Sequence, residues 1–99
     1  MIAPIIFRPE AEQDVVSARA WYEQQRQGLG AQFTTRLSEI IETIGERPNL
    51  YACLWENVRA VPLRKFPYVV YYRVQPDHVE ILAVLHGRRD PSIWMSRVQ

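Results

Sequence analysis

Four residues in the second half of this 99-residue chain have side chains suited to phosphate chemistry. The guanidiniums of Arg64, Arg73 and Arg88 can hold phosphate oxygens, and His86 can serve as acid or base because imidazole exchanges protons near neutral pH. Acid–base chemistry at a phosphate needs this combination: a group that exchanges protons, and cations that stabilise the phosphate. As an alternative, a histidine at a strand end often makes a structural hydrogen bond, and Arg73 could be a solvated strand residue.

Other chemistries lack the residues they need. Cys53 is the only cysteine, so it has no internal disulfide partner and no metal-ligand spacing around it. The segment 28–30 (Gly-Leu-Gly) joins two predicted helices instead of following a strand, which argues against a phosphate-binding loop. No serine has histidine and aspartate partners at the spacing of a nucleophilic triad. We therefore predict no metal and no cofactor.

Charge is distributed unevenly along the chain. The net charge of +1 argues against a protein that coats nucleic acid. Residues 1–49 hold five arginines against seven acidic residues, whereas residues 50–99 hold seven basic residues against four acidic ones. A local basic surface can steer an anionic partner even when the total charge is small. The second half is therefore where we expect a binding surface.

Length and composition indicate one folded domain over residues 1–99. The hydrophobic share of 47% and the aromatic share of 11% are ample for a folded unit. No segment approaches the ~20 apolar residues of a membrane-spanning helix, and the first residues lack the basic start and long apolar run of a signal peptide. With a single cysteine, these features predict a cytoplasmic protein that does not bind membranes.

The first half predicts a strand at residues 5–7 and two helices. Pro9 and Glu10 suit the first turn of a helix. Its apolar face comprises Ala11, Val15, Ala18 and Tyr22. Gly28 can adopt the left-handed conformation that ends a helix. A second apolar stripe comprises Phe33, Leu37, Ile40, Ile41 and Ile44. The short connection predicts an antiparallel helix hairpin.

The second half predicts extended structure, beginning with segments at residues 51–55 and 58–63. A strand rich in Val and Tyr follows at residues 68–74, then a turn at 75–78. Residues 79–85 are apolar at nearly every position, which is typical of a central strand covered on both faces. Asp90 and Pro91 predict the start of a short closing helix that contains Trp94. The predicted order is β-α-α-β-β-β, in the α+β class, with Trp21, Tyr22, Phe33 and Tyr68 in the core.

Taken together, these motifs resemble the RelE/ParE superfamily of bacterial type II toxin–antitoxin toxins, nearer the ParE-like branch. The match covers nearly the whole chain, and its specificity lies in the joint order of the residues. They are Phe7, Pro9, Ala11, Asp14, Trp21-Tyr22, Gly28-Leu29-Gly30, Phe33, Pro48, Arg59, Leu63, Phe66-Pro67-Tyr68, Tyr71-Tyr72, Ile81-Leu82-Ala83-Val84, His86, Arg88-Arg89-Asp90-Pro91, Trp94 and Arg97.

The resemblance implies a helix hairpin packed on one face of a small, mostly antiparallel sheet. It also implies a cognate antitoxin whose disordered segment folds over the toxin. Two activities are implied as alternatives. RelE-like members cleave mRNA in the ribosomal A site, whereas ParE-like members are similar to gyrase poisons, which stall the enzyme on cut DNA.

The chain departs from the RelE-like pattern because it has one lysine, Lys65, and no tyrosine after Tyr72. The preferred hypothesis is therefore a toxin that binds a macromolecular target, DNA gyrase, and is blocked by an antitoxin. The predicted target-binding residues are Arg59, Arg64, Lys65, Arg73, Arg88, Arg89, Trp94 and Arg97. The alternatives are a ribosome-dependent endoribonuclease that uses His86, Arg64, Arg73 and Arg88, and a non-toxic interaction module derived from the family.

Overall fold

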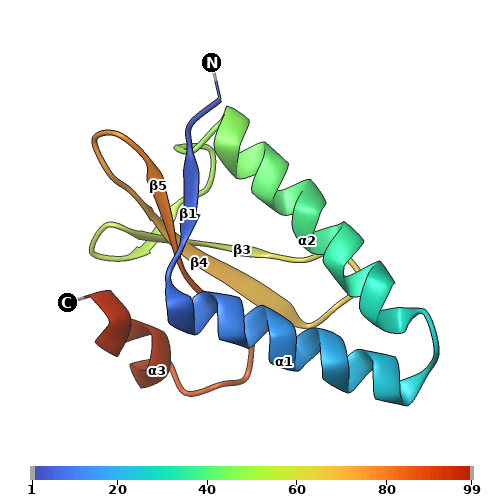
Figure 1. Cartoon of the computed structure of the whole chain (residues 1–99). Coiled ribbons are helices and arrows are strands. Elements are labelled where there is room, and N and C mark those ends of the chain that lie inside the picture. Colours follow the sequence, from blue (N-terminus) through green and yellow to red (C-terminus); the bar gives the residue numbers. More distant parts are fainter. Residues whose placement is uncertain (1, 99) are drawn as a thin grey trace.

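A five-stranded mixed sheet lies at the centre of the fold in the computed structural model, which describes residues 2–98 (Figure 1). The elements are β1 (Ile5–Phe7), α1 (Pro9–Gln25), α2 (Leu29–Glu46), β2 (Cys53–Trp55), β3 (Val58–Pro62), β4 (Tyr68–Val74), β5 (Val79–His86), α3 (Ser92–Met95) and the 3-10 turn η1 (Ser96–Val98). The spatial order is β1-β5-β4-β3-β2. Only β1 and β5 pair in parallel. The predicted α+β class is confirmed, and the short β2 makes four strands after the helices.

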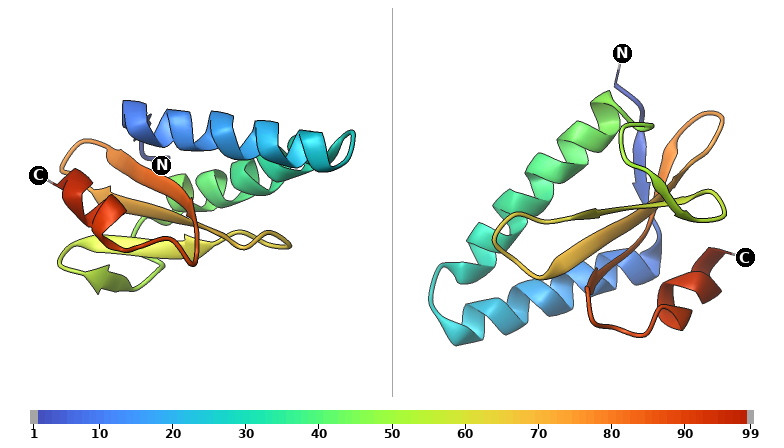
Figure 2. Two further views of the ribbon diagram at one scale, coloured as in Figure 1. Left: turned by 90° about the horizontal axis from the view of Figure 1, so that it is seen from below. Right: turned by 180° about the vertical axis from the view of Figure 1, so that it is seen from behind.

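The two long helices form the predicted antiparallel hairpin on one side of the sheet (Figure 2). Gly28 adopts a φ of +88°, the left-handed conformation expected there. The Glu23 carboxylate accepts the backbone N–H groups of Gly28 and Gly30, each at 3.0 Å for the shorter contact. These hydrogen bonds lower the pKa of Glu23. A side chain of α1 thereby satisfies backbone donors at the start of α2, which fixes the reversal of the chain.

Close approach of the helices at Gly30 gives a stability prediction. A Cβ added at Gly30 would lie 2.8 Å from the backbone oxygen of Arg19 on α1, so alanine would push the helices apart. We expect Gly30→Ala to lower the free energy of unfolding by about 2 kcal/mol, measured by urea denaturation. Gly87→Ala is the matched control, since its Cβ would meet Pro67 at an ordinary 3.6 Å. Equal losses in both variants would contradict this account.

The sheet face that meets the helices carries the larger core. Its buried aromatic members include Tyr22 and Phe33, whose rings stack at 5.5 Å, and Tyr72. Both predicted helix stripes lie here, as do Val70 and Tyr72, which alternate along β4 with Val69 and Tyr71 on the opposite face. The Tyr72 hydroxyl donates to the Pro48 carbonyl at 2.8 Å, and burial raises the pKa of Tyr72 to about 12.

The opposite face of the sheet carries a second core covered by α3. Trp94 is 3% exposed, and its ring stacks on Tyr71 of β4 at 4.7 Å. A bulge in β5 places both Leu82 and Ala83 in this core, because Tyr71 pairs with Ala83 but Tyr72 pairs with Ile81. The two cores confirm that β5 is covered on both faces. Within residues 2–98, no helix has the length and apolar character needed to cross a bilayer.

Candidate target-binding surface

Four exposed cations gather at one end of the sheet, and we call this set the basic rim. Arg64 and Lys65 lie in the turn between β3 and β4, while Arg88 and Arg89 follow β5. The two segments are adjacent because the Gly87 N–H donates to the Pro67 carbonyl at 2.8 Å. Between residues 2 and 98, no rim side chain has an ion pair or a hydrogen bond. Their charges are thus free to face a partner.

The turn that carries Lys65 has an uncommon backbone conformation. Lys65 adopts a φ of +69°, in the left-handed region that non-glycine residues rarely occupy. Such positions cost free energy and recur at binding and catalytic sites. The neighbouring Leu63 is buried, and its N–H donates to the Tyr68 carbonyl at 2.9 Å. Leu63 therefore anchors the backbone of the turn from which the two cations extend.

His86 lies at the same end of the sheet as the basic rim. It pairs with Tyr68 across β4 and β5, and the two rings are 5.7 Å apart. Its Nδ1 accepts the backbone N–H of Arg88 at 3.1 Å. This hydrogen bond assigns the neutral ring a proton on Nε2. His86, Arg64 and Arg88, three of the four candidates for nuclease chemistry, therefore lie at the same end of the sheet.

Arg73, the fourth candidate, lies at the far end of β4. It pairs with Glu80 across the hairpin and is five residues along the strand from Tyr68, a separation of about 17 Å. Its Nε donates to the Glu80 carboxylate at 2.6 Å, and its Nη1 donates to the Val98 carbonyl at 2.7 Å. Arg73 is thus committed to the fold and does not share a site with His86. The predicted turn at 75–78 could have indicated this ion pair, because a hairpin with that turn sets Arg73 opposite Glu80.

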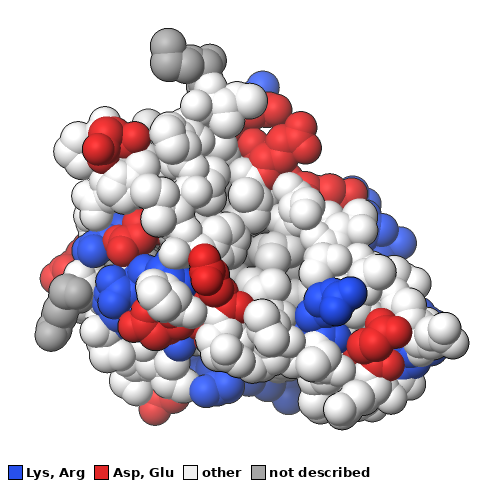
Figure 3. Space-filling model, viewed as in Figure 1, with Lys and Arg blue, Asp and Glu red and all other residues white. Residues whose placement is uncertain are grey.

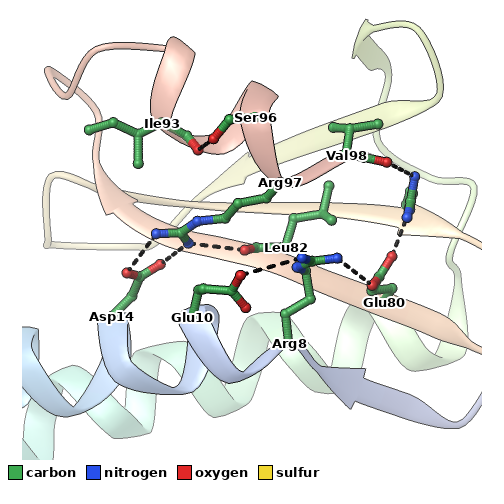
Figure 4. A network of polar contacts seen from close by, with 10 residues as sticks. Arg8, Glu10, Asp14, Glu80, Leu82, Ile93, Ser96, Arg97 and Val98 are labelled. Carbon is green, nitrogen blue, oxygen red and sulfur yellow. Dashed lines mark hydrogen bonds and ion pairs between the residues drawn. The ribbon is translucent and has the colours of Figure 1, made fainter.

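Arg97 is also engaged inside the molecule (Figure 4). Its guanidinium donates to both oxygens of Asp14 on α1, at 2.6 and 3.3 Å, and to the Leu82 carbonyl at 3.1 Å. Asp14 also accepts the Val84 N–H at 3.0 Å. The Asp14 and Arg97 side chains are 11% and 14% exposed. This nearly buried pair joins the C-terminal turn to α1 and β5. In the sequence, the only indication of it was an acidic residue, Asp14, beside the apolar stripe of a helix.

The remaining predicted target-binding residues also make contacts within the fold. Arg59 donates to the carbonyls of Tyr51 and Asn49, which holds the loop before β2. Trp94 lies on the face of the sheet, where its ring stacks on Tyr71. Arg59, Arg73, Arg97 and Trp94 therefore contribute to the folded structure. For the basic rim, a target-binding role stays a prediction.

Trp21 corrects the core predicted from the sequence. It is 54% exposed, whereas its neighbour Tyr22 is buried among aromatic rings. The core-facing positions of α1 are Ala11, Ala18 and Tyr22, and Trp21 lies outside that stripe. Tyr68, also expected in the core, is half-buried. The exposure of this indole beside the sheet end is a surface feature that the sequence pattern did not indicate.

A groove of about 700 Å³ lies between α2 and the turn that carries Lys65. Its apolar lining comprises Tyr22, Leu29, Phe66 and Pro67, and its cations are Arg26, Arg36 and Lys65. Arg36 pairs with Glu39 at 3.2 Å, and Glu39 is the only carboxylate among the described residues of the lining. Arg26 and Arg36 lie off the core stripes of the helices, so the sequence pattern did not indicate that they share a site.

Charges on the face of the two helices are mixed in sign. Figure 3 shows acidic and basic side chains close together at several places on this face, with uncharged surface between α1 and α2. Arg8 illustrates the pattern, because its guanidinium lies 3.4 Å from both Glu10 and Glu80. This face thus offers no uniform cationic patch, whereas the four cations of the basic rim have no ion pair within residues 2–98.

Comparison with known proteins agrees with this architecture. Residues 5–91 match the family described as the ParE toxin of the type II toxin–antitoxin system parDE. Toxin ParE2 of Mycobacterium tuberculosis, from two strains, is 29% identical over 82 residues, which cover 82% of this chain and 78% of the relative. The chromosomal ParDE system from P. aeruginosa has the same fold, with a TM-score of 0.76 and 16% identity over 86% of this chain and 96% of that one. The chain belongs to the ParE toxin family of type II toxin–antitoxin systems.

Proposed function

We propose that this protein arrests bacterial growth by binding DNA gyrase through its basic rim, and that a ParD-type antitoxin neutralises it. The observation that supports this proposal is that the cations of the second half fall into two groups. Arg64, Lys65, Arg88 and Arg89 are exposed at one sheet end, whereas Arg73 and Arg97 are paired with carboxylates. A cluster of unpaired cations favours encounter with an acidic or nucleic-acid-bound surface. The choice of gyrase rests on the resemblance to ParE-like gyrase poisons.

Binding is favoured over RNA cleavage by the position of Arg73. The endoribonuclease hypothesis needs His86, Arg64, Arg73 and Arg88 around one phosphate. Arg73 lies about 17 Å along β4 from the residue paired with His86, and its Nε and Nη1 are occupied. The C-terminal aromatic, Trp94, is buried and has no acidic proton to donate. What remains at the rim suits holding an anionic partner better than breaking a phosphodiester bond.

The groove beside α2 is the surface that best suits an antitoxin segment. An amphipathic segment can bury apolar residues against Leu29 and Phe66 while its acidic residues meet Arg26 and Lys65. A segment that is disordered when free can wrap such a surface and fold on it. The P. aeruginosa relative is described as a ParDE system, so a ParD-type partner is the natural candidate. The groove adjoins the basic rim through Lys65, so one segment could cover both.

One experiment tests both parts of the proposal. The purified full chain is added to gyrase, plasmid DNA and ATP, and the supercoiled and cleaved products are measured. We expect loss of supercoiling and accumulation of cleaved DNA, because a gyrase poison stalls the enzyme on cut DNA. Adding the cognate antitoxin in equal amount should restore supercoiling, since it covers the groove and the neighbouring rim.

Parallel assays identify the alternatives. Translating ribosomes with a defined message are incubated with the same protein, and circular dichroism establishes that it is folded. Unaffected gyrase together with A-site cuts in the message would reject the gyrase target in favour of an endoribonuclease. Unaffected gyrase and uncut message, together with harmless overexpression in the absence of antitoxin, would instead indicate a non-toxic interaction module.

A further inference from the structure

Beside the basic rim, two adjoining hollows open between α1 and the sheet end. They measure about 290 and 470 Å³ and share Trp21, Tyr68 and His86 in their linings. Arg89 lines the smaller hollow and Pro67 the larger one. The site thus lies where β4 begins and β5 ends, on the α1 side of the molecule. It is separate from the α2 groove, although Tyr22 and Pro67 border both.

Aromatic surface dominates this site. Trp21 is 54% exposed, and its indole packs edge-on against Tyr22 at 5.0 Å. Tyr68 packs against Tyr22 at 5.8 Å and against His86 at 5.7 Å. The Tyr22 ring, which contacts the indole, is itself packed against Tyr68, so the exposed Trp21 side chain is supported by buried and half-buried rings. An exposed indole on rigid supports is suited to stacking against a flat ligand such as a nucleobase.

Hydrogen-bond donors and a cation lie beside the aromatic surface. His86 presents Nε2–H, because its Nδ1 accepts from the Arg88 backbone. Burial raises the pKa of Tyr68, partly offset by the Arg89 guanidinium, so its hydroxyl keeps its proton and can donate. In the described part of the chain, that hydroxyl has no hydrogen-bond partner. The acid in the smaller hollow, Asp14, is balanced by Arg97 at 2.6 Å.

We propose that this site binds one nucleotide of single-stranded DNA, with the base stacked on Trp21 and the phosphate held by Arg89 and His86 Nε2. Arg88, the exposed residue before Arg89, would contact the next phosphate along the strand. A site of this size fits the small net charge, since it contacts one or two nucleotides and does not coat a polymer. The choice of DNA over RNA rests on the proposed gyrase target, where the toxin would lie beside cut DNA.

The test uses the full chain without gyrase and a fluorescein-labelled (dT)12 strand, followed by fluorescence anisotropy over a range of salt concentrations. We expect Trp21→Leu to weaken binding about tenfold, because each base–aromatic stack contributes on that scale. Its salt dependence should stay unchanged, since no phosphate contact is lost. Arg89→Gln should instead reduce the slope of log affinity against log salt by about 0.7, the value for one phosphate of a single strand.

Matched variants and competing ligands make the result decisive. Trp55→Leu removes a 37% exposed indole on the sheet edge, and Arg47→Gln removes a cation at the far end of α2; both should bind (dT)12 like the parent chain. Absence of binding, or equal loss in test and control variants, would overturn the proposal. Preference for (rU)12 would overturn the choice of DNA. If Trp21→Leu weakened antitoxin binding but left (dT)12 binding unchanged, Trp21 would belong to a protein interface, and the nucleotide-site proposal would be overturned. Because this binding test contains no gyrase, failure to bind (dT)12 would reject the nucleotide site without rejecting gyrase as the target.

Discussion

Replacement of Asp14 by asparagine is expected to lower the free energy of unfolding by roughly 3 kcal/mol. The Asp14 carboxylate balances Arg97 at 2.6 Å and accepts the Val84 N–H, and both charged side chains are nearly buried. Asparagine leaves the guanidinium with a much weaker acceptor and no opposite charge, in a place where water cannot fully replace it. Urea denaturation followed by circular dichroism measures the loss.

Burial, more than the existence of an ion pair, should set this cost. Glu39→Gln is the matched control, because it breaks the Arg36–Glu39 pair, whose side chains are 26% and 50% exposed. We expect that change to cost no more than about 0.5 kcal/mol. The double variant D14L/R97M should lose less than D14N alone, because no charge then stays buried without a partner. A D14N loss as small as that of E39Q would show that the pair does not hold the C-terminal turn.

Charge reversal at the basic rim is expected to abolish growth arrest. In the variant R88E/R89E, two exposed cations without an ion pair in the described part of the chain become acids facing the same target. Reversal replaces attraction with repulsion at a close interface, where each contact affects binding strongly. We expect the toxin concentration needed for half-maximal growth inhibition, or for half-maximal gyrase cleavage, to rise roughly 100-fold or more. Inducible expression in a bacterium and the gyrase assay measure the two effects.

The control for the rim is Arg47→Glu. Arg47 follows α2 directly. The Ala3 N–H donates to the Gly45 carbonyl near the end of α2, and the Val79 N–H at the start of β5 donates to the Pro4 carbonyl. Arg47 therefore lies at the end of the molecule where β5 begins, away from the basic rim. This variant changes charge far from the rim and should remain toxic. The rim variant should keep its melting temperature within about 2 °C, since exposed substitutions seldom change stability by more than about 0.5 kcal/mol. A folded, fully toxic R88E/R89E variant would exclude the rim as the docking surface.

Local sequence determined the elements of this protein and most of its core. The stripes on α1 and α2 bury because the residues of one helical face recur every three or four positions. Gly28 could be predicted as the turn because glycine alone enters the left-handed region without a steric cost. The apolar run of β5 indicated a strand with a core on each face, as found. Each of these features depends on neighbours a few residues away.

Tertiary structure decided which arginines remain available. The Asp14–Arg97 pair joins residues 83 positions apart, and the Arg8–Glu80 pair spans 72 positions, so the sequence does not show which carboxylate meets which guanidinium. The bulge at Leu82 and the exposure of Trp21 likewise depend on how α1 settles on the sheet. Charge type is a property of the residue, but its neutralisation is a property of the surroundings. The basic rim therefore became identifiable only from the fold, which brings carboxylates to Arg73 and Arg97 and, among residues 2–98, none to Arg88 and Arg89.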